Sequence, residues 1–254
     1  MNAKNKSHQG RRELLAAQGI TKYFGSMAAL KDLDFPVFAG EIFGIAGPNG
    51  AGKTTLFNVI SKALPLDRGK VWFDGRYIQG LPAHKICRLG IVRTFQIPAL
   101  FGSLTIYRNA LVGATFGYTN KMYDKEKTVR KVLNFVGLWE KRNTIAEELS
   151  LYERKVLMMA SALATKPKLL MLDEPIAGLS QIEYKHVMEL IKRINKEGLT
   201  VIIIEHNMDV LMGLSDRVMI LHHGEKICEG PPRKVCEDER VIKAYLGEKY
   251  VGER

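Results

Sequence analysis

One stretch decides the fold of this 254-residue chain: Gly47-Pro48-Asn49-Gly50-Ala51-Gly52-Lys53-Thr54. It matches the pattern G-x-x-x-x-G-K-[ST] at every position. The apolar run 42–46 precedes it and predicts a strand, and residues 54–61 can form a helix. Glycines allow such a loop to turn its backbone N–H groups inward, and a helix N-terminus adds about half a positive charge. The stretch therefore predicts a phosphate-binding loop.

The side chains of this loop predict how it holds a nucleotide. Lys53 is expected to reach the β- and γ-phosphates, and Thr54 to hold Mg²⁺ through its hydroxyl. A chance glycine-rich turn is the alternative, but strand, loop, lysine, hydroxyl and helix follow one another in the required order. The predicted cofactors are ATP and Mg²⁺. The predicted nucleotide-binding residues here are Gly47, Pro48, Asn49, Gly50, Ala51, Gly52, Lys53, Thr54 and Thr55.

The composition excludes several classes. Hydrophobic residues make up 46% and charged residues 26%, which is ordinary for a soluble globular domain. No apolar run approaches the roughly 20 residues that span a bilayer, and the polar N-terminus lacks the apolar centre of a secretory signal. The three cysteines form no C-x-x-C pair, so we expect free thiols rather than a metal site.

The chain is strongly basic, with a formal net charge of +11. This charge suits phosphate ligands, nucleic acid or an anionic membrane face, and it does not choose between them. Four of the cations, Lys4, Lys6, Arg11 and Arg12, lie in or beside a polar tail, 1–11, that we predict to be disordered.

The order of the segments predicts an α/β fold. Residues 13–95 are rich in strand-forming stretches, and residues 105–163 carry apolar residues at helical spacing. Strands then alternate with helices, which favours a mainly parallel sheet with helices on both faces. We expect a single domain, 12–254, in which 12–95 and 166–254 form the core and 96–165 a helical subdomain.

A second chemical signal follows the apolar run 169–172, which ends in Asp173 and Glu174. Ligands bind at the carboxyl ends of the strands in open α/β sheets. We expect Asp173 to anchor Mg²⁺ and Glu174 to point toward the attacking water. A strand that ends in Asp-Glu is common by itself, and it gains meaning only because a phosphate loop precedes it.

Three runs resemble the ATP-binding-cassette (ABC) ATPases: Asp173-Glu174-Pro175, Ala177-Gly178-Leu179-Ser180 and Ile202-Ile203-Ile204-Glu205-His206. The likeness extends from about Glu13 to Glu248. It implies hydrolysis of ATP by a P-loop NTPase core of mainly parallel sheet, with an antiparallel β-subdomain and an inserted α-helical subdomain.

The resemblance also implies roles for single residues. Phe24, with Tyr23 as the nearby alternative, matches the aromatic residue that stacks on adenine, a contact worth about 1–3 kcal/mol. Gln96 matches the glutamine that contacts Mg²⁺ and the attacking water, and His206 the histidine that touches the γ-phosphate. Taken alone, none of these three residues would predict a function. The catalytic set is then Lys53, Gln96, Glu174 and His206, and the metal set Thr54, Gln96 and Asp173.

The chain departs from the family at the signature Leu-Ser-Gly-Gly-Gln, which binds the γ-phosphate of ATP on an opposing subunit. The aligned residues are Leu149-Ser150-Leu151-Tyr152-Glu153. Ser150 remains as an expected helix N-cap and possible phosphate donor, but both glycines are gone. Either this helix still serves with adjusted geometry, or it faces a degenerate site in a heterodimer. Ser180 also replaces the aspartate usual at its position.

Residues 205–210, 214–217 and 241–248, together with 93–96, resemble one branch of the family. This branch contains the ATPases of high-affinity branched-chain amino acid uptake, with urea and amide importers as near relatives. It implies two different ATPase subunits beneath two permease subunits at the cytoplasmic face of the membrane, fed by an extracytoplasmic solute-binding protein. We expect the apolar loop 97–101 to contact a permease helix.

Two other functions stay open as alternatives. An ABC ATPase that acts on nucleic acid would carry a long coiled-coil or zinc-bearing insertion, but only 54 positions separate Gln96 from Ser150, without heptads or C-x-x-C. We therefore predict no nucleic-acid partner. A nucleotide sensor without hydrolysis is compatible with the altered signature, although Lys53, Glu174 and His206 argue against it.

Overall fold

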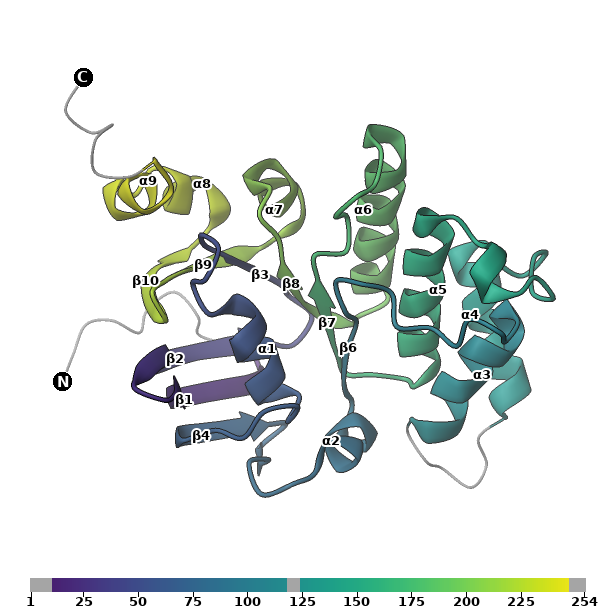
Figure 1. Ribbon diagram of the computed structural model, residues 1–254, viewed down its shortest axis with the longest axis horizontal. Helices are drawn as coiled ribbons and strands as arrows, with labels where there is room; N and C mark the ends of the chain where they lie inside the picture. Colours follow the sequence, from purple (N-terminus) through teal and green to yellow (C-terminus); the bar gives the residue numbers. More distant parts are fainter. Residues whose placement is uncertain (1–10, 118–123, 247–254) are drawn as a thin grey trace.

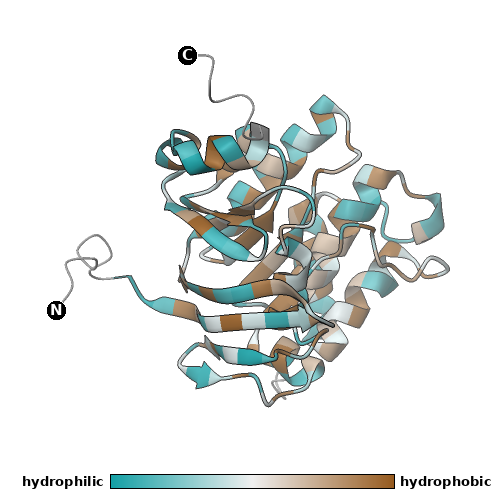
Figure 2. Cartoon of the chain, turned by 60° about the vertical axis from the view of Figure 1, so that its left-hand side comes forward, coloured by the Kyte–Doolittle hydropathy of each residue, from teal (hydrophilic) through white to brown (hydrophobic). Residues whose placement is uncertain are grey.

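The computed structural model describes residues 11–117 and 124–246 and contains two sheets and a group of helices (Figure 1). The first sheet is antiparallel, and its strands follow one another in the order β2-β1-β4-β5. Figure 2 shows both hydrophobic and hydrophilic residues along these strands. In β2, Leu33, Phe35 and Val37 are buried at every second position, as expected for a strand with one buried face, whereas β1 buries the continuous run 14–17. The predicted antiparallel subdomain is confirmed. Its strands are β1 (Glu13–Phe24), β2 (Met27–Phe38), β4 (Arg68–Phe73) and β5 (Arg76–Tyr77).

The second sheet holds six strands in the order β10-β9-β3-β8-β7-β6. Neighbouring strands are parallel, except that β10 is antiparallel to β9. Ile42 and Ala46 of β3 pack in one hydrophobic cluster, and Phe43 and Ile45 in the other, so both faces of the sheet are covered. The strands are β3 (Ile42–Ala46), β6 (Ile91–Arg93), β7 (Leu169–Asp173), β8 (Thr200–Ile204), β9 (Arg217–His222) and β10 (Glu225–Gly230).

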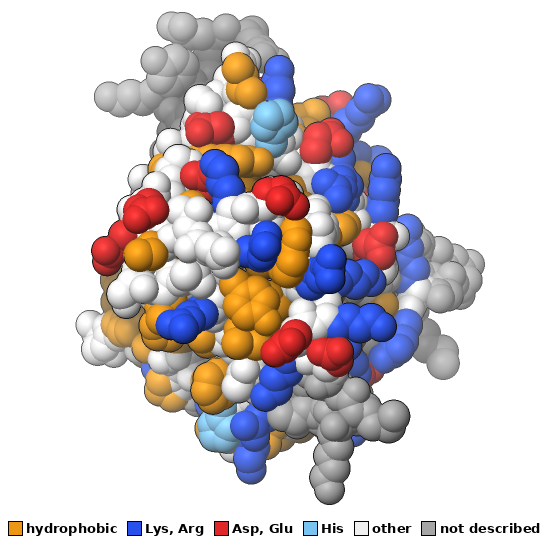
Figure 3. Space-filling view, turned by 90° about the vertical axis from the view of Figure 1, so that its right-hand side faces the viewer, with side chains coloured by type: hydrophobic (Ala, Val, Ile, Leu, Met, Phe, Trp, Pro, Cys, Tyr) orange, Lys and Arg blue, Asp and Glu red, His pale blue; other side chains and the backbone are white. Residues whose placement is uncertain are grey.

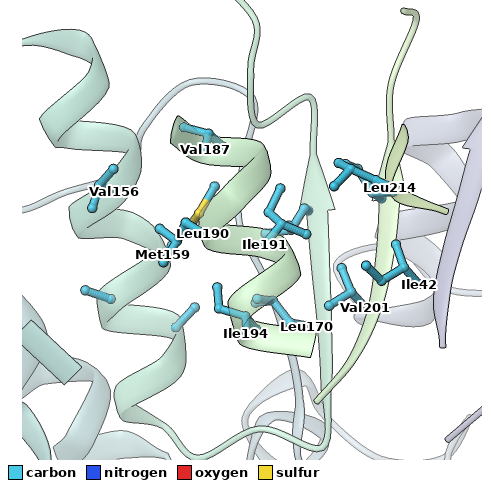
Figure 4. Packing of buried hydrophobic residues seen from close by; sticks show 14 of the residues in the cluster. Ile42, Val156, Met159, Leu170, Val187, Leu190, Ile191, Ile194, Val201 and Leu214 are labelled. Carbon is cyan, nitrogen blue, oxygen red and sulfur yellow. The ribbon is translucent and has the colours of Figure 1, made fainter. Parts of the chain in front are cut away.

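Helices connect most of the strands, and the longest of these helices, α6, buries an apolar stripe. In α6, Val187, Leu190, Ile191 and Ile194 recur at helical spacing and lie between α5 and the sheet (Figure 4). Burying an aliphatic side chain completely contributes about 1.5–3 kcal/mol. The helices outside the insertion are α1 (Lys53–Ile60), α2 (Ala83–Leu89), α6 (Gln181–Lys196), α7 (Met208–Leu214), α8 (Pro232–Cys236) and α9 (Glu239–Leu246), of which α8 and α9 follow the last strand.

A group of helices is inserted between β6 and β7, and it confirms the predicted helical subdomain (Figure 1). Figure 3 views this end of the molecule and shows many Lys and Arg side chains. On α4, Lys125, Lys127, Arg130 and Lys131 are exposed. Residues 1–10 of the predicted tail lie outside the described residues. The inserted elements are α3 (Ile106–Phe116), α4 (Lys125–Val136), the short 3₁₀ helix η1 (Ala146–Glu148) and α5 (Leu151–Ala164).

Candidate nucleotide-binding and catalytic site

The predicted phosphate loop connects β3 to α1, and two of its glycines are required by the space around them. A Cβ atom on Gly47 would lie 2.1 Å from the carbonyl oxygen of Leu221, and one on Gly52 would lie 2.4 Å from that of Ala29. Both residues also have positive φ angles, 148° and 102°. Gly50 has no atom within 4 Å of its added Cβ position, so the loop is open at that residue and can admit a phosphate.

Lys53 stands at the start of α1 with its side chain folded back over the loop. Its ammonium donates to the carbonyl oxygens of Gly47 at 2.7 Å and Pro48 at 2.9 Å. Burial lowers the pKa of Lys53, and the nearby carboxylates of Glu174 and Asp173 act in the opposite direction. The first N–H groups of a helix have no acceptor within the helix. The loop therefore offers a buried cation and open backbone donors to an anion.

A pocket of about 400 Å³ opens above the loop. Phe24 lies on its rim with 46% of its surface exposed, and the ammonium of Lys22 lies 5.7 Å from the centre of the Phe24 ring. An exposed aromatic face at this place suits an adenine ring. His223, to which the sequence analysis gave no role, also lines the pocket. The lining residues are Phe24, Met27, Ala28, Ala29, Asn49, Gly50, Ala51, Gly52, Lys53, Thr54, Thr55, Glu174, His206 and His223.

Asp173 is the last residue of β7 and is 3% exposed. Burial raises the pKa of its carboxyl, and Arg93 opposes this effect. Arg93, at the end of β6, donates to Oδ2 of Asp173 at 3.0 Å. In the sequence, Arg93 stood out only as part of the run 93–96 that resembles one branch of the family. Because Arg93 ends a strand beside β7, its pairing with a carboxylate at the end of β7 could have been expected.

Glu174 follows Asp173 and has a left-handed backbone, with a φ angle of 45°. Its Oε2 atom accepts a hydrogen bond of 2.5 Å from Nε2 of Gln96, and its Oε1 atom contacts Nε2 of His206. The three residues follow β6, β7 and β8, whose carboxyl ends meet at one edge of the sheet. The structure thus brings the predicted residues Gln96, Glu174 and His206 into contact.

Glu205 is a buried carboxyl that the sequence analysis did not assign. It is 3% exposed and accepts a hydrogen bond of 3.2 Å from the backbone N–H of Ile176. Burial raises its pKa to about 7, and this N–H group acts in the opposite direction. A carboxyl directly after an apolar strand and before His206 was the signal in the sequence.

Ser150 is not among the residues that line the pocket above the phosphate loop, and it caps the start of α5, so its predicted capping role is confirmed. Its Oγ accepts from the backbone N–H of Glu153 at 3.2 Å, and Oε2 of Glu153 accepts from the N–H of Ser150 at 3.0 Å. The ammonium of Lys141, 2.6 Å from Oε1 of Glu153, holds the pKa of that carboxyl down. The ring of Tyr152 packs edge-on against His186. A phosphate role for Ser150 stays a prediction.

A family model described as ABC transporter matches residues 30–177. The chain belongs to the ABC transporter family. A second model, described as Branched-chain amino acid ATP-binding cassette transporter, matches residues 225–251 of this ABC protein. The predicted family and its branch are therefore confirmed, and the chain is an ABC transporter ATPase and a subunit of such a transporter.

Curated relatives agree with this assignment. The high-affinity branched-chain amino acid transport ATP-binding protein LivG of Escherichia coli K12 is 34% identical over 92% of this chain and 98% of its own length. The corresponding protein BraF of Pseudomonas aeruginosa is 35% identical over 93% of this chain and 99% of its own. A probable LivG of Archaeoglobus fulgidus is 34% identical over 92% and 96%.

Solved structures agree with the fold. A nucleotide-free ATP-binding cassette from an ABC transporter has a TM-score of 0.85 at 31% identity and covers 93% of this chain and 100% of its own. A dimeric post-hydrolysis cassette bound to ADP and Pi has a TM-score of 0.77 at 26% identity and covers 87% and 99%. Within the described residues of this ABC ATPase, no helix combines the length and apolar character that crossing a membrane requires.

Proposed function

We propose that this ABC ATPase hydrolyses MgATP to drive the uptake of branched-chain amino acids, with urea or amides as the runner-up solute class. The observation that carries the proposal is the contact of Glu174 with Gln96 and His206 beside an open phosphate loop. The branch of the family supports the solute class, because the relatives named above are described as branched-chain amino acid transport proteins.

The residues present fit a nucleotide with Mg²⁺. The triphosphate would lie along the loop, with Lys53 at its β- and γ-phosphates and Phe24 against the adenine. Thr54, Gln96 and Asp173 would supply the hard oxygen ligands that Mg²⁺ prefers. One oxygen of Asp173 pairs with Arg93, which leaves its second oxygen for the metal. A bound Mg²⁺ would neutralise charge that develops on the phosphate oxygens.

Glu174 would orient the attacking water at the γ-phosphate. Its carboxylate is held on both oxygens, by Gln96 on one side and His206 on the other. A held carboxylate keeps one geometry, and a positioned general base contributes about 10²–10⁴ in rate. His206 lines the same pocket and would also sense the γ-phosphate.

The proposed working unit is a head-to-tail pair of cassettes beneath two permease subunits at the cytoplasmic face of the membrane, with a solute-binding protein on the other side. The likeness to a dimeric cassette bound to ADP and Pi supports the pair. Each phosphate loop would face the signature helix of the other cassette. The two cassettes would bind each other more tightly with ATP than with ADP, and this difference in affinity would drive the permease. The solute itself would not touch this chain.

The permease would dock on the loop after Gln96. In this loop, 97–101, Ile97 is 80% exposed and Phe101 57%, and Phe95 just before Gln96 adds a third exposed apolar side chain at 46%. Clustered exposed apolar side chains mark interaction sites. The loop adjoins Gln96, which links the docking surface directly to the catalytic carboxylate.

The test is solute-dependent ATPase activity in reconstituted vesicles that hold this chain, a second cassette, the permease and the binding protein. We expect leucine-loaded binding protein to stimulate hydrolysis, and Ile97→Asp to abolish this stimulation while ATP binding persists. Stimulation by urea or amides alone would overturn the solute class. Absence of ATP hydrolysis under every condition would favour the nucleotide sensor. Nucleic-acid ATPases are not among the relatives described above.

A further inference from the structure

Lys155 is a lysine inside the protein. It lies in the second turn of α5, five residues after Ser150, and is 1% exposed. Lysines are almost never fully buried unless their ammonium group has partners. Burial lowers the pKa of Lys155, while Glu205 and Glu174 act in the opposite direction. The partners of this ammonium therefore identify its role.

The ammonium of Lys155 donates to the backbone carbonyl oxygen of Glu174 at 3.0 Å and lies 3.5 Å from that of Gln96. One turn further along α5, Sδ of Met158 accepts from the backbone N–H of Phe95 at 3.5 Å. The helix α5 thus contacts the backbone of Phe95 and Gln96, which precede the docking loop 97–101, and the backbone of Glu174.

The contact with Glu174 acts on a strained backbone. A left-handed φ angle costs a residue other than glycine about 1–2 kcal/mol, and such a conformation persists only where its surroundings fix it. The N–H of Glu174 donates to the carbonyl oxygen of Ile204 at 3.0 Å. Its own carbonyl oxygen accepts from Lys155 and from the N–H of Ala177, the latter at 3.2 Å. Both backbone polar groups of Glu174 are therefore held.

Glu205 lies near this ammonium, because its carboxyl group is one of the two that raise the pKa of Lys155 against the effect of burial. It holds the loop after Glu174 through the N–H of Ile176 and is buried at 3% exposure. The carboxyl and the ammonium thus hold neighbouring parts of the same segment, Glu174 and Ile176, from two sides. Lys155 therefore links α5, the helix that Ser150 caps, to the backbone of Glu174.

We propose that Lys155 is a positioning residue for ATP hydrolysis. Its ammonium ties the left-handed backbone of Glu174 and the carbonyl group of Gln96 to α5, the helix that begins at the signature. This role rests on the proposed function, because it acts through the catalytic carboxylate. The inserted helical subdomain and the carboxylate then move as one unit, so that docking of the opposing cassette on α5 sets the position of Glu174.

The test is a double-mutant cycle between Lys155→Met and Glu174→Gln in the assembled transporter. With Glu174 present, loss of the ammonium should lower kcat by about 10- to 100-fold, because a misplacement near 1 Å is that costly. The Kd for ATP should change by less than about 2-fold, since Lys155 does not touch the phosphate loop. In the Glu174→Gln background, the residual rate should change by less than about 2-fold.

If Lys155 only stabilises the fold, Lys155→Met should lower the rate by the same factor with Glu174 present and in the Glu174→Gln background. That result would overturn the proposal. Lys155→Arg, which keeps a cationic donor, should recover part of the loss. Lys192→Met makes the same chemical change at a partly exposed position on α6 and should leave the rate unchanged.

Two further outcomes are distinguishable. If Lys155→Met does not fold, as shown by lost ATP binding, the cycle is run with Lys155→Arg, and equal losses in both backgrounds overturn the proposal there too. An assembled wild-type transporter without ATPase activity overturns the proposed function, and the assignment of Lys155 falls with it.

Discussion

The phosphate loop and the stretch Leu149–Glu153 both lie at the N-terminus of a helix, yet their N–H groups are used in opposite ways. In the loop, glycines and the folded-back Lys53 leave the helix start open to a pocket. At α5, the side chains of Ser150 and Glu153 satisfy the backbone N–H groups of each other. A helix N-terminus binds phosphate only where its donors are left open.

Charge widens the difference between the two regions. The loop presents the ammonium of Lys53, whereas α5 presents the carboxylate of Glu153. Lys141 lowers the pKa of Glu153, so this carboxyl is ionised at neutral pH. A carboxylate repels a triphosphate. We infer that the chain keeps a complete phosphate loop for its own nucleotide and offers an altered signature, Leu149–Glu153, to the nucleotide of the opposing cassette.

The largest expected effect comes from rebuilding the signature. In a Glu174→Gln background, the combined changes Leu151→Gly, Tyr152→Gly and Glu153→Gln should create ATP-dependent dimers of this chain alone. The change removes the carboxylate, leaves the ammonium of Lys141 (now 2.6 Å from Oε1 of Glu153) without that partner, and lets a phosphate approach the backbone at two glycines, so association should tighten by about 10²-fold or more. Light scattering with and without ATP measures this gain.

Two controls accompany the rebuilt signature. Glu153→Gln alone isolates the effect of charge, and ATP binding at the chain's own loop shows that each variant is folded. The chain that carries Glu174→Gln and keeps its own signature is compared directly. If it dimerises equally well on ATP, then α5 already binds the nucleotide of the opposing cassette, and the contrast between the two helix starts has no effect on association.

An intermediate effect is expected from glycine substitutions in the phosphate loop. Gly47→Ala would bring a Cβ within 2.1 Å of the Leu221 carbonyl oxygen, whereas Gly50→Ala meets no atom within 4 Å. Both residues have positive φ angles, so an alanine at either position carries backbone strain, and the two variants differ in the steric overlap of the added Cβ. We expect Gly47→Ala to cost about 3 kcal/mol and Gly50→Ala about 1 kcal/mol.

Thermal unfolding without nucleotide measures this difference. Each kcal/mol lowers the Tm by about 2–4 °C in a protein of this size. Equal Tm values for the two variants would show that the loop can move away from β9, and the close packing of Gly47 would then not explain why the pattern requires glycine there.

Much of the fold followed from local patterns in the sequence. The loop Gly47–Thr54 fixed the strand before it and the helix after it, and the helical spacing of 105–163 indicated the insertion. Boundaries were less exact. The helix α6 begins at Gln181 because Ser180 caps it and the side chain of Glu183 returns to Ser180, and helical spacing alone does not locate this start.

The site was predictable only in part. Gln96, Glu174 and His206 meet because parallel strands end at one edge, which a motif can anticipate. Arg93 and Lys155 were missed because their roles depend on burial by segments far away in the chain. A lysine at residue 155 is typical of an exposed helix face, and nothing local shows that the carbonyl of Glu174 lies above it.

The smallest expected effect concerns Glu205, whose carboxyl accepts a hydrogen bond from Ile176 and acts on the ammonium of Lys155. Its pKa of about 7 exceeds the value of an unfolded glutamic acid, so the folded state binds the extra proton. Stability from this group is therefore full at low pH and is lost as the pH rises through 7. Glu205→Gln removes this dependence, so its Tm relative to wild type should rise between pH 6 and pH 8. The gain corresponds to about 1 kcal/mol, or about 2–4 °C. A Tm difference that is the same at both pH values would mean that Glu205 is already ionised at pH 6, and that the ammonium of Lys155 on the signature helix outweighs the effect of burial.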